Sequence, residues 1–402
     1  MSSLPFSRLP LLAQLEIIRY AGFPDLFRLS TCSKKVAKII RLANISLRKF
    51  GIKMYEDQVM FNFQFPKTKC DYEIAVDRDF REWMSENRLF MRESMDSSGN
   101  QWKLDIRVRK NEFRAVAGEI LRFLLTQFKC PKLSYLMVKP SENTKIMVET
   151  MIKPYFSTVQ FLSCVQDQDS KPLTREQFEW VLDCITVTKL FTSECEVDTE
   201  VAYCEGFQAD IVRIKHSNWV DLHSILNSTA KYLNFTRYAL LAQPMNLILK
   251  AWIFKEKLIN LKKFHTEVLV QYLVRSMYMD RVMEGIQEAV LTEEEQKYFD
   301  EQEIEDVVKI IRRIDGRLAA LSVNQLAVLT LPSILSFVVV VDPSMTNTYQ
   351  QCKLNASLLK KCHLPQETRQ SPQTSFRFPN SCILADKFAE VLNRSRSILS
   401  SR

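Results

Sequence analysis

Strand-like and helix-like segments alternate at a nearly regular interval through the middle of this 402-residue chain. Short runs that suit strands begin at Val187, Asp210, Lys231 and Leu258. Segments with helical spacing of apolar residues accompany them, as in residues 219–227 and 245–254. Parallel strands require a crossover of this kind between them, usually a helix. The pattern therefore predicts a mixed α/β fold for this part of the chain.

The interval between successive predicted strands is about 20 to 30 residues. This interval resembles stacked strand-plus-helix units of the leucine-rich-repeat type, in which neighbouring units cover the apolar face that one unit cannot bury. The repeat in this chain is degenerate and lacks the usual Asn ladder. We therefore expect a body of degenerate leucine-rich-repeat-like units, with a plain α/β domain as the alternative.

The first fifty residues differ from the rest in both pattern and charge. Residues 8–20 and 24–49 have helical spacing, and a turn lies between them. Pro10 suits a first helical turn, and Asp25 suits a helix start. Nine Lys or Arg and two Asp or Glu give this segment a charge of +7, nearly all of the chain's +8. The basic character of the protein therefore belongs to a small N-terminal helical module.

The later segments divide the remaining chain. Residues 58–65 and 101–110 alternate apolar and polar side chains, which predicts strands, and residues 112–128 have helical spacing. Asp315 and Gly316 suit a tight hairpin turn. Composition and pattern together predict four regions, namely the helical module at 1–50, a connecting α/β segment at 51–170, a repeat-like region at 171–342 and a polar, partly disordered tail at 343–402.

The sequence lacks the motifs of several enzyme classes. Its seven glycines are scattered, so neither a P-loop nor a dinucleotide-binding turn can form. The four histidines and ten cysteines give no zinc-ligand spacing and no Cys-x-x-Cys pair. A Gly-x-Ser-x-Gly elbow is also missing. We therefore expect no enzyme activity, no catalytic residue, no metal and no cofactor.

Two features predict an intracellular protein, either cytoplasmic or nuclear. The start of the chain has no charged segment leading into an apolar run, as a secretory signal would. The scattered cysteines suit reduced, mostly buried thiols rather than a disulfide framework. The longest apolar run, residues 326–340, contains Pro332 and is shorter than the roughly 18 residues of a membrane span, so we predict buried strands there.

The N-terminal module carries a distinctive order of residues. In chain order these are Leu9 and Pro10, then Leu15, Ile17 and Ile18, then Pro24, then Leu26, Leu29 and Ser30, and finally Lys34 and Lys35. This order resembles an F-box, the three-helix module that docks on the Skp-type adaptor of cullin-RING ubiquitin ligases. The resemblance covers about forty residues and assigns adaptor binding to all of these positions except Ser30 and Lys35.

Some positions depart from the usual F-box pattern. Ala13 and Gln14 stand where many members have larger apolar residues, and Val36 stands where many have a tryptophan, which predicts a lower affinity for the adaptor. The Ser-Lys-Lys form at residues 33–35 resembles the large nematode group of F-box proteins. Residues 178–264 are similar to the F-box associated region, type 2, of those proteins, most recognisably around Trp252.

The resemblance implies a substrate-recognition subunit of an SCF-type (Skp-cullin-F-box) ubiquitin ligase that performs no bond chemistry itself. The F-box would dock on the adaptor and through it on a cullin. The C-terminal body would hold a protein target and raise its effective concentration beside the ubiquitin carrier. We predict that the substrate contacts come from the strand-bearing surface at Lys189, Arg213, Lys215, Tyr232 and Arg237. Ordinary solvated surface is the alternative for these five residues.

The apolar content of the N-terminal module agrees with the resemblance. A forty-residue unit cannot bury all of its apolar residues internally, and contiguous exposed apolar patches mark partner sites. Three alternatives stay open. The helices could pack on the chain's own body, the basic module could bind nucleic acid through clustered Lys and Arg, or the chain could be a repeat scaffold without a ligase role. Against nucleic acid, residues 26–38 lack base-reading side chains, and the same charge suits an acidic adaptor.

Overall fold

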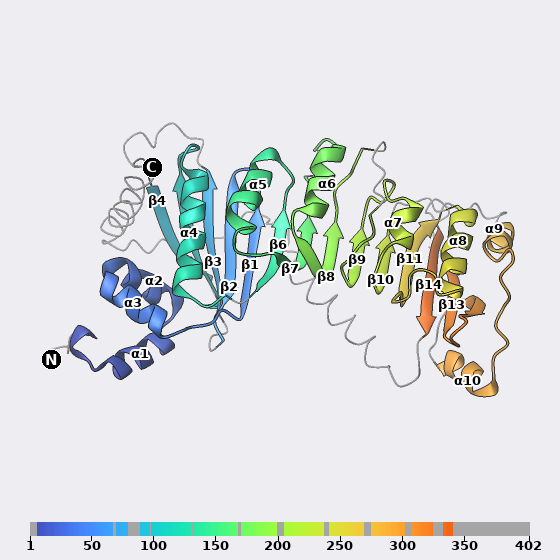
Figure 1. Cartoon of the computed structure of the whole chain (residues 1–402). Helices are drawn as coiled ribbons and strands as arrows, with labels where there is room; N and C mark the ends of the chain where they lie inside the picture. The colour runs from blue at the N-terminus through green and yellow to red at the C-terminus, as the bar shows by residue number, and fades with distance from the viewer. Residues whose placement is uncertain are drawn as a thin grey trace. The chain divides into compact units, whose positions relative to one another are not determined.

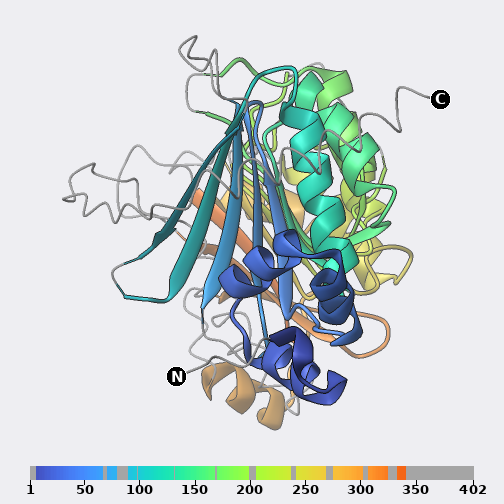
Figure 2. The ribbon, with the colours of Figure 1, turned by 90° about the vertical axis from the view of Figure 1, so that its left-hand side faces the viewer.

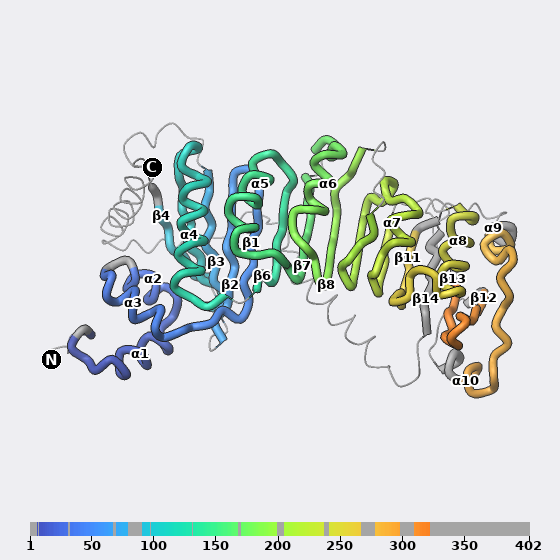
Figure 3. The backbone as a smooth tube through the Cα atoms, in the orientation of Figure 1, coloured from blue at the N-terminus to red at the C-terminus, as the bar shows by residue number. Residues whose placement is uncertain are grey.

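The computed structural model describes most of the chain up to residue 340, and Figure 3 traces its backbone. The described ranges are residues 6–66, 70–78, 89–96, 98–130, 132–167, 170–198, 205–236, 241–268, 275–301, 307–324 and 333–340. The chain divides into two compact units with the break between Glu196 and Val197. The predicted tail at 343–402 lies outside the described residues, and the predicted boundaries after residues 50 and 170 stay predictions.

The first unit consists of helices at its N-terminus followed by a mixed sheet with further helices (Figure 1). Its helices are η1 (Phe6–Arg8), α1 (Leu11–Tyr20), α2 (Phe23–Cys32), α3 (Lys34–Leu42), α4 (Phe113–Gln127), α5 (Glu142–Met147), the π-helical η2 (Val148–Ile152) and α6 (Arg175–Asp183). Its strands are β1 (Lys49–Met54), β2 (Gln58–Gln64), β3 (Asp71–Arg78), β4 (Leu89–Met95), β5 (Gln101–Val108), β6 (Leu133–Val138), β7 (Thr158–Cys164) and β8 (Thr186–Ser193).

The strand order in the first unit is β4-β5-β3-β2-β1-β6-β7-β8. Strands β1, β6, β7 and β8 are parallel neighbours, whereas β2 is antiparallel to both β1 and β3. Strands β2 and β5 alternate buried and partly exposed residues, and the buried side chains of β5 are Trp102, Leu104, Ile106 and Val108. In Figure 2, α4 lies along one face of these strands. The predicted strands at 58–65 and 101–110 and the predicted helix at 112–128 are confirmed.

The segment with helical spacing at residues 24–49 forms two helices, as the resemblance to a three-helix module implies, and helix ends at Leu42. Ser33 has an extended backbone, with φ −153° and ψ 128°, and it separates α2 from α3. Asn44, just after α3, has φ 51°, a left-handed conformation that Asn tolerates better than most residues. The chain then pairs with distant backbone instead of continuing the helix, because the Leu47 N–H donates to the carbonyl of Lys129 at 2.9 Å.

The N-terminal helices are fastened to the sheet through Phe23, the first residue of α2. Its ring centroid lies 4.7 Å from that of Phe63 and 5.3 Å from that of Trp102, both in edge-on geometry. The other rings within reach are Phe27, Phe65, Tyr72 and Phe128, at 5.7 to 6.3 Å. Edge-on aromatic pairs are favourable beyond the area that they bury. We call these seven side chains the aromatic cluster.

A second set of contacts supports the same junction between the helices and the sheet. Phe27 meets Phe123 of α4 edge-on, with centroids 5.5 Å apart. Arg28 of α2 forms an ion pair with Glu93 of β4. Helix α3 also contacts both α1 and α4. The three N-terminal helices therefore share their core with the rest of the first unit.

The second unit is a smaller mixed sheet with helices. Its strands are β9 (Ile211–Ile214), β10 (Tyr232–Phe235), β11 (Lys263–Val268), β12 (Val307–Arg312), β13 (Leu318–Asn324) and β14 (Ser333–Val340), in the order β9-β10-β11-β14-β13-β12. Its helices are α7 (Leu222–Leu226), α8 (Ala242–Ile253), α9 (Arg275–Val282) and α10 (Glu293–Glu301). Strands β9, β10 and β11 are parallel, and β12, β13 and β14 form antiparallel pairs.

The hairpin between β12 and β13 confirms the predicted turn at Asp315 and Gly316. Gly316 has φ 89°, which suits a residue without a Cβ. The buried Arg313 guanidinium donates to Asp315 at 2.5 and 2.8 Å and to the carbonyl of Ile259 at 3.1 Å. The same guanidinium lies 5.4 Å from the ring centroid of Trp252 in α8. These contacts join the hairpin to the core of the second unit.

Helices separate the parallel strands of two series, one in each unit, as the alternation in the sequence predicts. Helices α5 and α6 lie between the strands of the series β6, β7 and β8, and α7 and α8 lie between those of β9, β10 and β11. The mixed α/β class is therefore confirmed, and the leucine-rich-repeat type of these units stays a prediction. Strand β14 covers residues 333–340 of the long apolar run, whereas residues 325–332 lie outside the described part.

We expect Phe23→Ala to destabilise the first unit strongly. Removing a fully buried ring from the aromatic cluster leaves a cavity, and such substitutions cost about 3 to 5 kcal/mol. The exposed Leu12 of α1 provides a matched control, because Leu12→Ala removes a large apolar side chain from the surface. Urea unfolding followed by tryptophan fluorescence gives the free energy of unfolding of both variants. Equal stability of the two variants would contradict a shared core.

Candidate protein interaction site

Helix α1 buries two side chains and exposes most of its large apolar ones. Gln14 and Ile18 are buried, one turn apart on the same side of the helix. Leu15 is half-buried, and the other large apolar side chains are exposed, with fractions of 51% for Leu11, 77% for Leu12, 46% for Ile17 and 74% for Tyr20. Four such side chains on a ten-residue helix exceed the isolated exposure that is common on protein surfaces. The arrangement is typical of a surface that another protein covers.

Helices α2 and α3 turn their apolar side chains inward. Phe23, Leu26 and Phe27 of α2 and Ile39 and Ile40 of α3 are buried. The outer side of α3 is basic, and its exposed cations are Lys34, Lys35, Lys38 and Arg41. Leu42 at the end of α3 is also exposed. A partner that meets these helices would therefore meet apolar side chains on α1 and positive charge on α3.

The nine residues predicted to bind the adaptor differ in how far they are exposed to solvent. Pro10, Ile17 and Lys34 are exposed. Leu9, Leu15, Pro24 and Leu29 are half-buried. Adaptor binding by the nine residues stays a prediction. Ile18 and Leu26 are fully buried. Their role here is to hold the helices together and against the sheet.

Sequence reasoning missed Leu11, Leu12, Tyr20 and Leu42 as candidate surface residues. The signal was present, because apolar residues in 9–20 occur on all sides of the predicted helix and not along one stripe. It also missed Phe23, which lies in the segment predicted as a turn. The alternative that the helices pack on their own body holds for the inner faces of α2 and α3 and leaves α1 largely uncovered.

The comparison with family models identifies this helical module. An F-box domain matches at residues 6–47. The match spans η1 and all three helices, including the exposed apolar residues of α1 and the basic residues of α3. The comparisons with curated proteins and with solved structures found no match. The F-box domain suggests an SCF-type substrate adaptor, since F-box domains generally bind the Skp-type adaptor and thereby the cullin.

The five residues predicted to contact a substrate are placed only in part. Lys189 is an exposed residue of β8 in the first unit. Arg213 and Tyr232 are half-buried residues of β9 and β10, and Lys215 is exposed directly after β9, all in the second unit. Arg237 lies outside the described residues. Arg213 and Tyr232 therefore belong to neighbouring strands.

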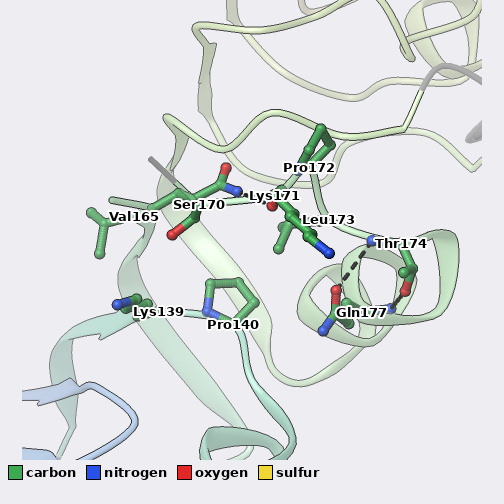
Figure 4. A pocket seen from close by; sticks show the side chains of 10 residues that line it. Lys139, Pro140, Val165, Ser170, Lys171, Pro172, Leu173, Thr174 and Gln177 are labelled. Atoms are coloured by element: carbon green, nitrogen blue, oxygen red, sulfur yellow. Dashed lines mark hydrogen bonds between the residues drawn. The ribbon is translucent and has the colours of Figure 1, made fainter. Parts of the chain in front are cut away.

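A cavity of about 300 Å³ lies beside the carboxyl ends of β6 and β7, next to the start of α6 (Figure 4). Its polar walls are largely engaged. Thr174 and Gln177 form a capping box at the N-terminus of α6, and the Gln166 amide donates to the carbonyl of Lys171 at 2.5 Å. Lys139 forms an ion pair with Asp167. The lining residues include two lysines but no histidine, cysteine or carboxylate, so they offer no acid-base pair.

The described cysteines have the character of structural thiols. Cys164, Cys184 and Cys195 are buried, and Cys70 and Cys130 are half-buried. Burial raises the pKa of Cys130, Cys184 and Cys195 to about 12 and also raises that of Cys164 well above its ordinary value. These thiols are protonated at neutral pH, which disfavours nucleophilic chemistry. Within the described ranges, no group of three His, Cys, Asp or Glu residues is placed to hold a metal ion.

No helix among the described residues is long and apolar enough to cross a membrane. The predicted apolar run contributes a strand to the second unit where the structure describes it.

Gln14 has a structural role that explains one departure from the usual F-box pattern. Its buried side-chain amide donates to the carbonyl of Leu9 at 2.7 Å and to that of Phe6 at 3.2 Å. Both carbonyls lie in the segment that leads into α1, and the Phe6 carbonyl also accepts from the Leu9 backbone N–H at 3.2 Å. A larger apolar residue at position 14 would leave these carbonyls without this donor. Gln14 therefore fixes the entry into the helix that carries Leu11 and Leu12.

We expect Gln14→Ala to loosen the start of α1 and to lower stability by about 1 to 3 kcal/mol, because the carbonyls of Leu9 and Phe6 both lose the side-chain donor, and only that of Phe6 keeps a backbone donor. Glu16→Ala is the control, since it changes an exposed residue of the same helix whose ion pair with Arg19 contributes little. Urea unfolding gives the stability, and amide exchange of residues 6–13 reports the local effect. Unchanged exchange in Gln14→Ala would contradict this role.

Proposed function

We propose that this protein is the substrate-recognition subunit of an SCF-type ubiquitin ligase. The observation that carries the proposal is the F-box match at residues 6–47 together with the exposed apolar side chains of α1. The F-box would bind a Skp-type adaptor, and through it a cullin. A protein target would bind elsewhere on the chain. Ubiquitin transfer would be performed by the other subunits, so the proposal assigns no catalytic residue, metal or cofactor to this chain.

The packing of α1 to α3 suits such a role. A ligase subunit has to hold its target near the ubiquitin carrier, and a rigid support raises the effective concentration at the right place. The aromatic cluster joins α2 to the sheet of the first unit, so the adaptor-binding helices and that sheet form one body. An adaptor on α1 would therefore have a fixed position relative to β1–β8.

Charge supports an acidic adaptor surface as the partner of α3. Lys34, Lys35, Lys38 and Arg41 are exposed along one nine-residue helix. Complementary charge increases the association rate and orients the partner. The same cations favour nucleic acid as a second candidate function, because phosphates also require clustered Lys and Arg. The exposed Leu11 and Leu12 favour a protein partner, since aliphatic side chains form no hydrogen bond or ion pair with phosphate.

The finer features of the resemblance belong to the same proposal. We infer that residues 178–264 form an F-box associated region of the nematode type 2, and that the strand-helix units are degenerate leucine-rich repeats. The substrate contacts would come from the body, with Lys189, Arg213, Lys215, Tyr232 and Arg237 as predicted participants. The setting would be intracellular, where such ligases work. A protein-interaction scaffold without a ligase role is the alternative.

Co-purification with a Skp-type adaptor tests the proposal. We expect the full chain to retain the adaptor in a stoichiometric complex. Leu12→Asp combined with Tyr20→Asp should weaken binding at least about tenfold, because charged groups would replace buried apolar contacts. Leu241→Asp, which changes an exposed leucine of the second unit, is the matched control and should bind as the parent does. Size-exclusion chromatography of the mixed proteins gives the stoichiometry.

Three outcomes of this experiment would contradict the proposed function or its contact surface. A folded parent chain that retains no adaptor would rule out the ligase function and favour the scaffold. Equal loss in the double variant and in Leu241→Asp would mean that α1 is not the contact surface. Binding of single-stranded nucleic acid by a parent chain that retains no adaptor would favour the second candidate.

A further inference from the structure

The face of β9, β10 and β11 opposite α7 and α8 carries positive charge that none of the described residues neutralises in an ion pair. Strand alternation puts Val212, Leu233 and Phe264 on the buried face, which α7 and α8 cover (Figure 1). The opposite face carries Ile211, Tyr232 and Lys263 in one cross-strand row and Arg213, Asn234 and His265 in the next. Lys215 follows β9 and is exposed. We call these seven residues the basic face.

The cations of the basic face are available to a ligand. Among the described residues, Arg213, Lys215 and Lys263 have no ion-pair partner, whereas the nearby Lys231 is paired with Asp210 at 2.9 Å. The three strands contain one acidic residue, Glu267, which β11 places one row beyond His265. The local charge therefore favours an acidic ligand. Neighbouring cations that lack counter-ions repel each other, and a bound anion relieves that repulsion.

A second observation comes from Asn234 at the centre of the basic face. Its side-chain Oδ1 is buried and accepts no hydrogen bond. A buried acceptor without a donor costs free energy, so few are found in folded proteins. A ligand with an N–H group at this position would satisfy it. A peptide backbone supplies such a donor at every residue except proline.

We propose that the basic face binds an acidic, extended segment of a target protein. Carboxylates of the segment would pair with Arg213 and Lys263, and a backbone N–H would donate to Asn234. Tyr232 and Ile211 would contact the aliphatic parts of the segment. This inference rests on the proposed function, because it gives the class of target that the ligase subunit would hold.

The spacing of the cations fits an extended chain. Arg213 and Lys263 are two strands and one row apart, which corresponds to about 12 Å for ordinary sheet dimensions. An extended peptide advances about 3.3 Å per residue, so acidic residues four positions apart span the same distance and point to the same side. A single acidic residue would reach one cation. The segment that fits best therefore has acidic residues at i and i+4.

The proposal includes Arg213, Lys215 and Tyr232 from the sequence prediction and adds Asn234, Lys263 and His265. The register of three parallel strands brings these six residues together with Ile211. The sequence separates Arg213 from Lys263 by fifty positions, so their proximity depends on the pairing of β9 and β11 with β10. Lys189 belongs to the first unit and is not part of the basic face.

Fluorescence anisotropy with the full chain tests the proposal. The probe is a labelled peptide of about twelve residues, long enough for three rows of the sheet, with Glu at every fourth position and Ser or Gly elsewhere. The same peptide with Gln in place of Glu and a single-stranded oligothymidine of equal charge serve as comparison ligands. The variants are Arg213→Glu and Lys263→Glu, with Arg281→Glu on the exposed side of α9 as the control for net charge.

We expect the Glu peptide to bind better than the Gln peptide and better than the oligothymidine. Arg213→Glu and Lys263→Glu should each weaken binding of the Glu peptide about tenfold or more, and Arg281→Glu should leave it unchanged. Asn234→Leu should weaken peptide binding without lowering the unfolding midpoint, because the lost acceptor is unsatisfied in the free protein. A merely structural residue would lower the midpoint instead.

Three results would overturn the proposal. These are equal binding of the Glu and Gln peptides, equal loss in Arg281→Glu, and tighter binding of the oligothymidine, which would make the basic face a nucleic-acid surface. Adaptor binding is measured on the same preparations of the full chain, so that the two proposals are tested separately. A chain that binds adaptor but no acidic peptide contradicts this inference alone, and a chain that binds the peptide but no adaptor contradicts the proposed ligase function alone.

Discussion

The contact of Phe23 with the aromatic cluster is the interaction on which the N-terminal part of this protein depends. A three-helix module of about forty residues buries too little apolar surface to be stable alone. Phe23 reaches past its own helices to Phe63, Trp102 and three further rings, and Phe27 and Arg28 add contacts to α4 and β4. The module therefore obtains its stability from the sheet. This leaves α1, whose inner face needs only Gln14 and Ile18, free to present Leu11, Leu12 and Tyr20 outward.

Two kinds of surface follow from the way helices and strands are covered. On α1, apolar side chains are exposed because the inner face of the helix is already satisfied by α3 and by the start of the chain. On β9, β10 and β11, polar and charged side chains face away from the core because the crossover helices α7 and α8 cover one side of the strands. An apolar surface suits a stable partner, and a charged surface suits a ligand that is held and released. A substrate-recognition subunit requires both.

The sequence was sufficient for the features that local pattern controls. Alternation predicted β2 and β5, helical spacing predicted α4, and the residues from Leu9 to Lys35 indicated the F-box. The sequence was insufficient where contacts between distant residues determine the structure. Strand β3 has five consecutive buried residues, so its period of two is hidden. The helical spacing at 24–49 does not show that helix ends at Leu42, before Asn44, where the chain turns to pair with the segment after α4. The structural role of Phe23 depends on partners in β2, β3 and β5 and on Phe128 just after α4, which no local window contains.

Hydrogen–deuterium exchange of the full chain, with and without a Skp-type adaptor, tests the central claim most directly. If the F-box helices belong to the body and α1 presents the binding surface, amides near Phe23 and Phe27 are protected in the free chain as strongly as those of β2. Adaptor then adds protection chiefly in residues 11–20. Rapid exchange of α2 in the free chain, or added protection by adaptor that excludes α1, would contradict the account.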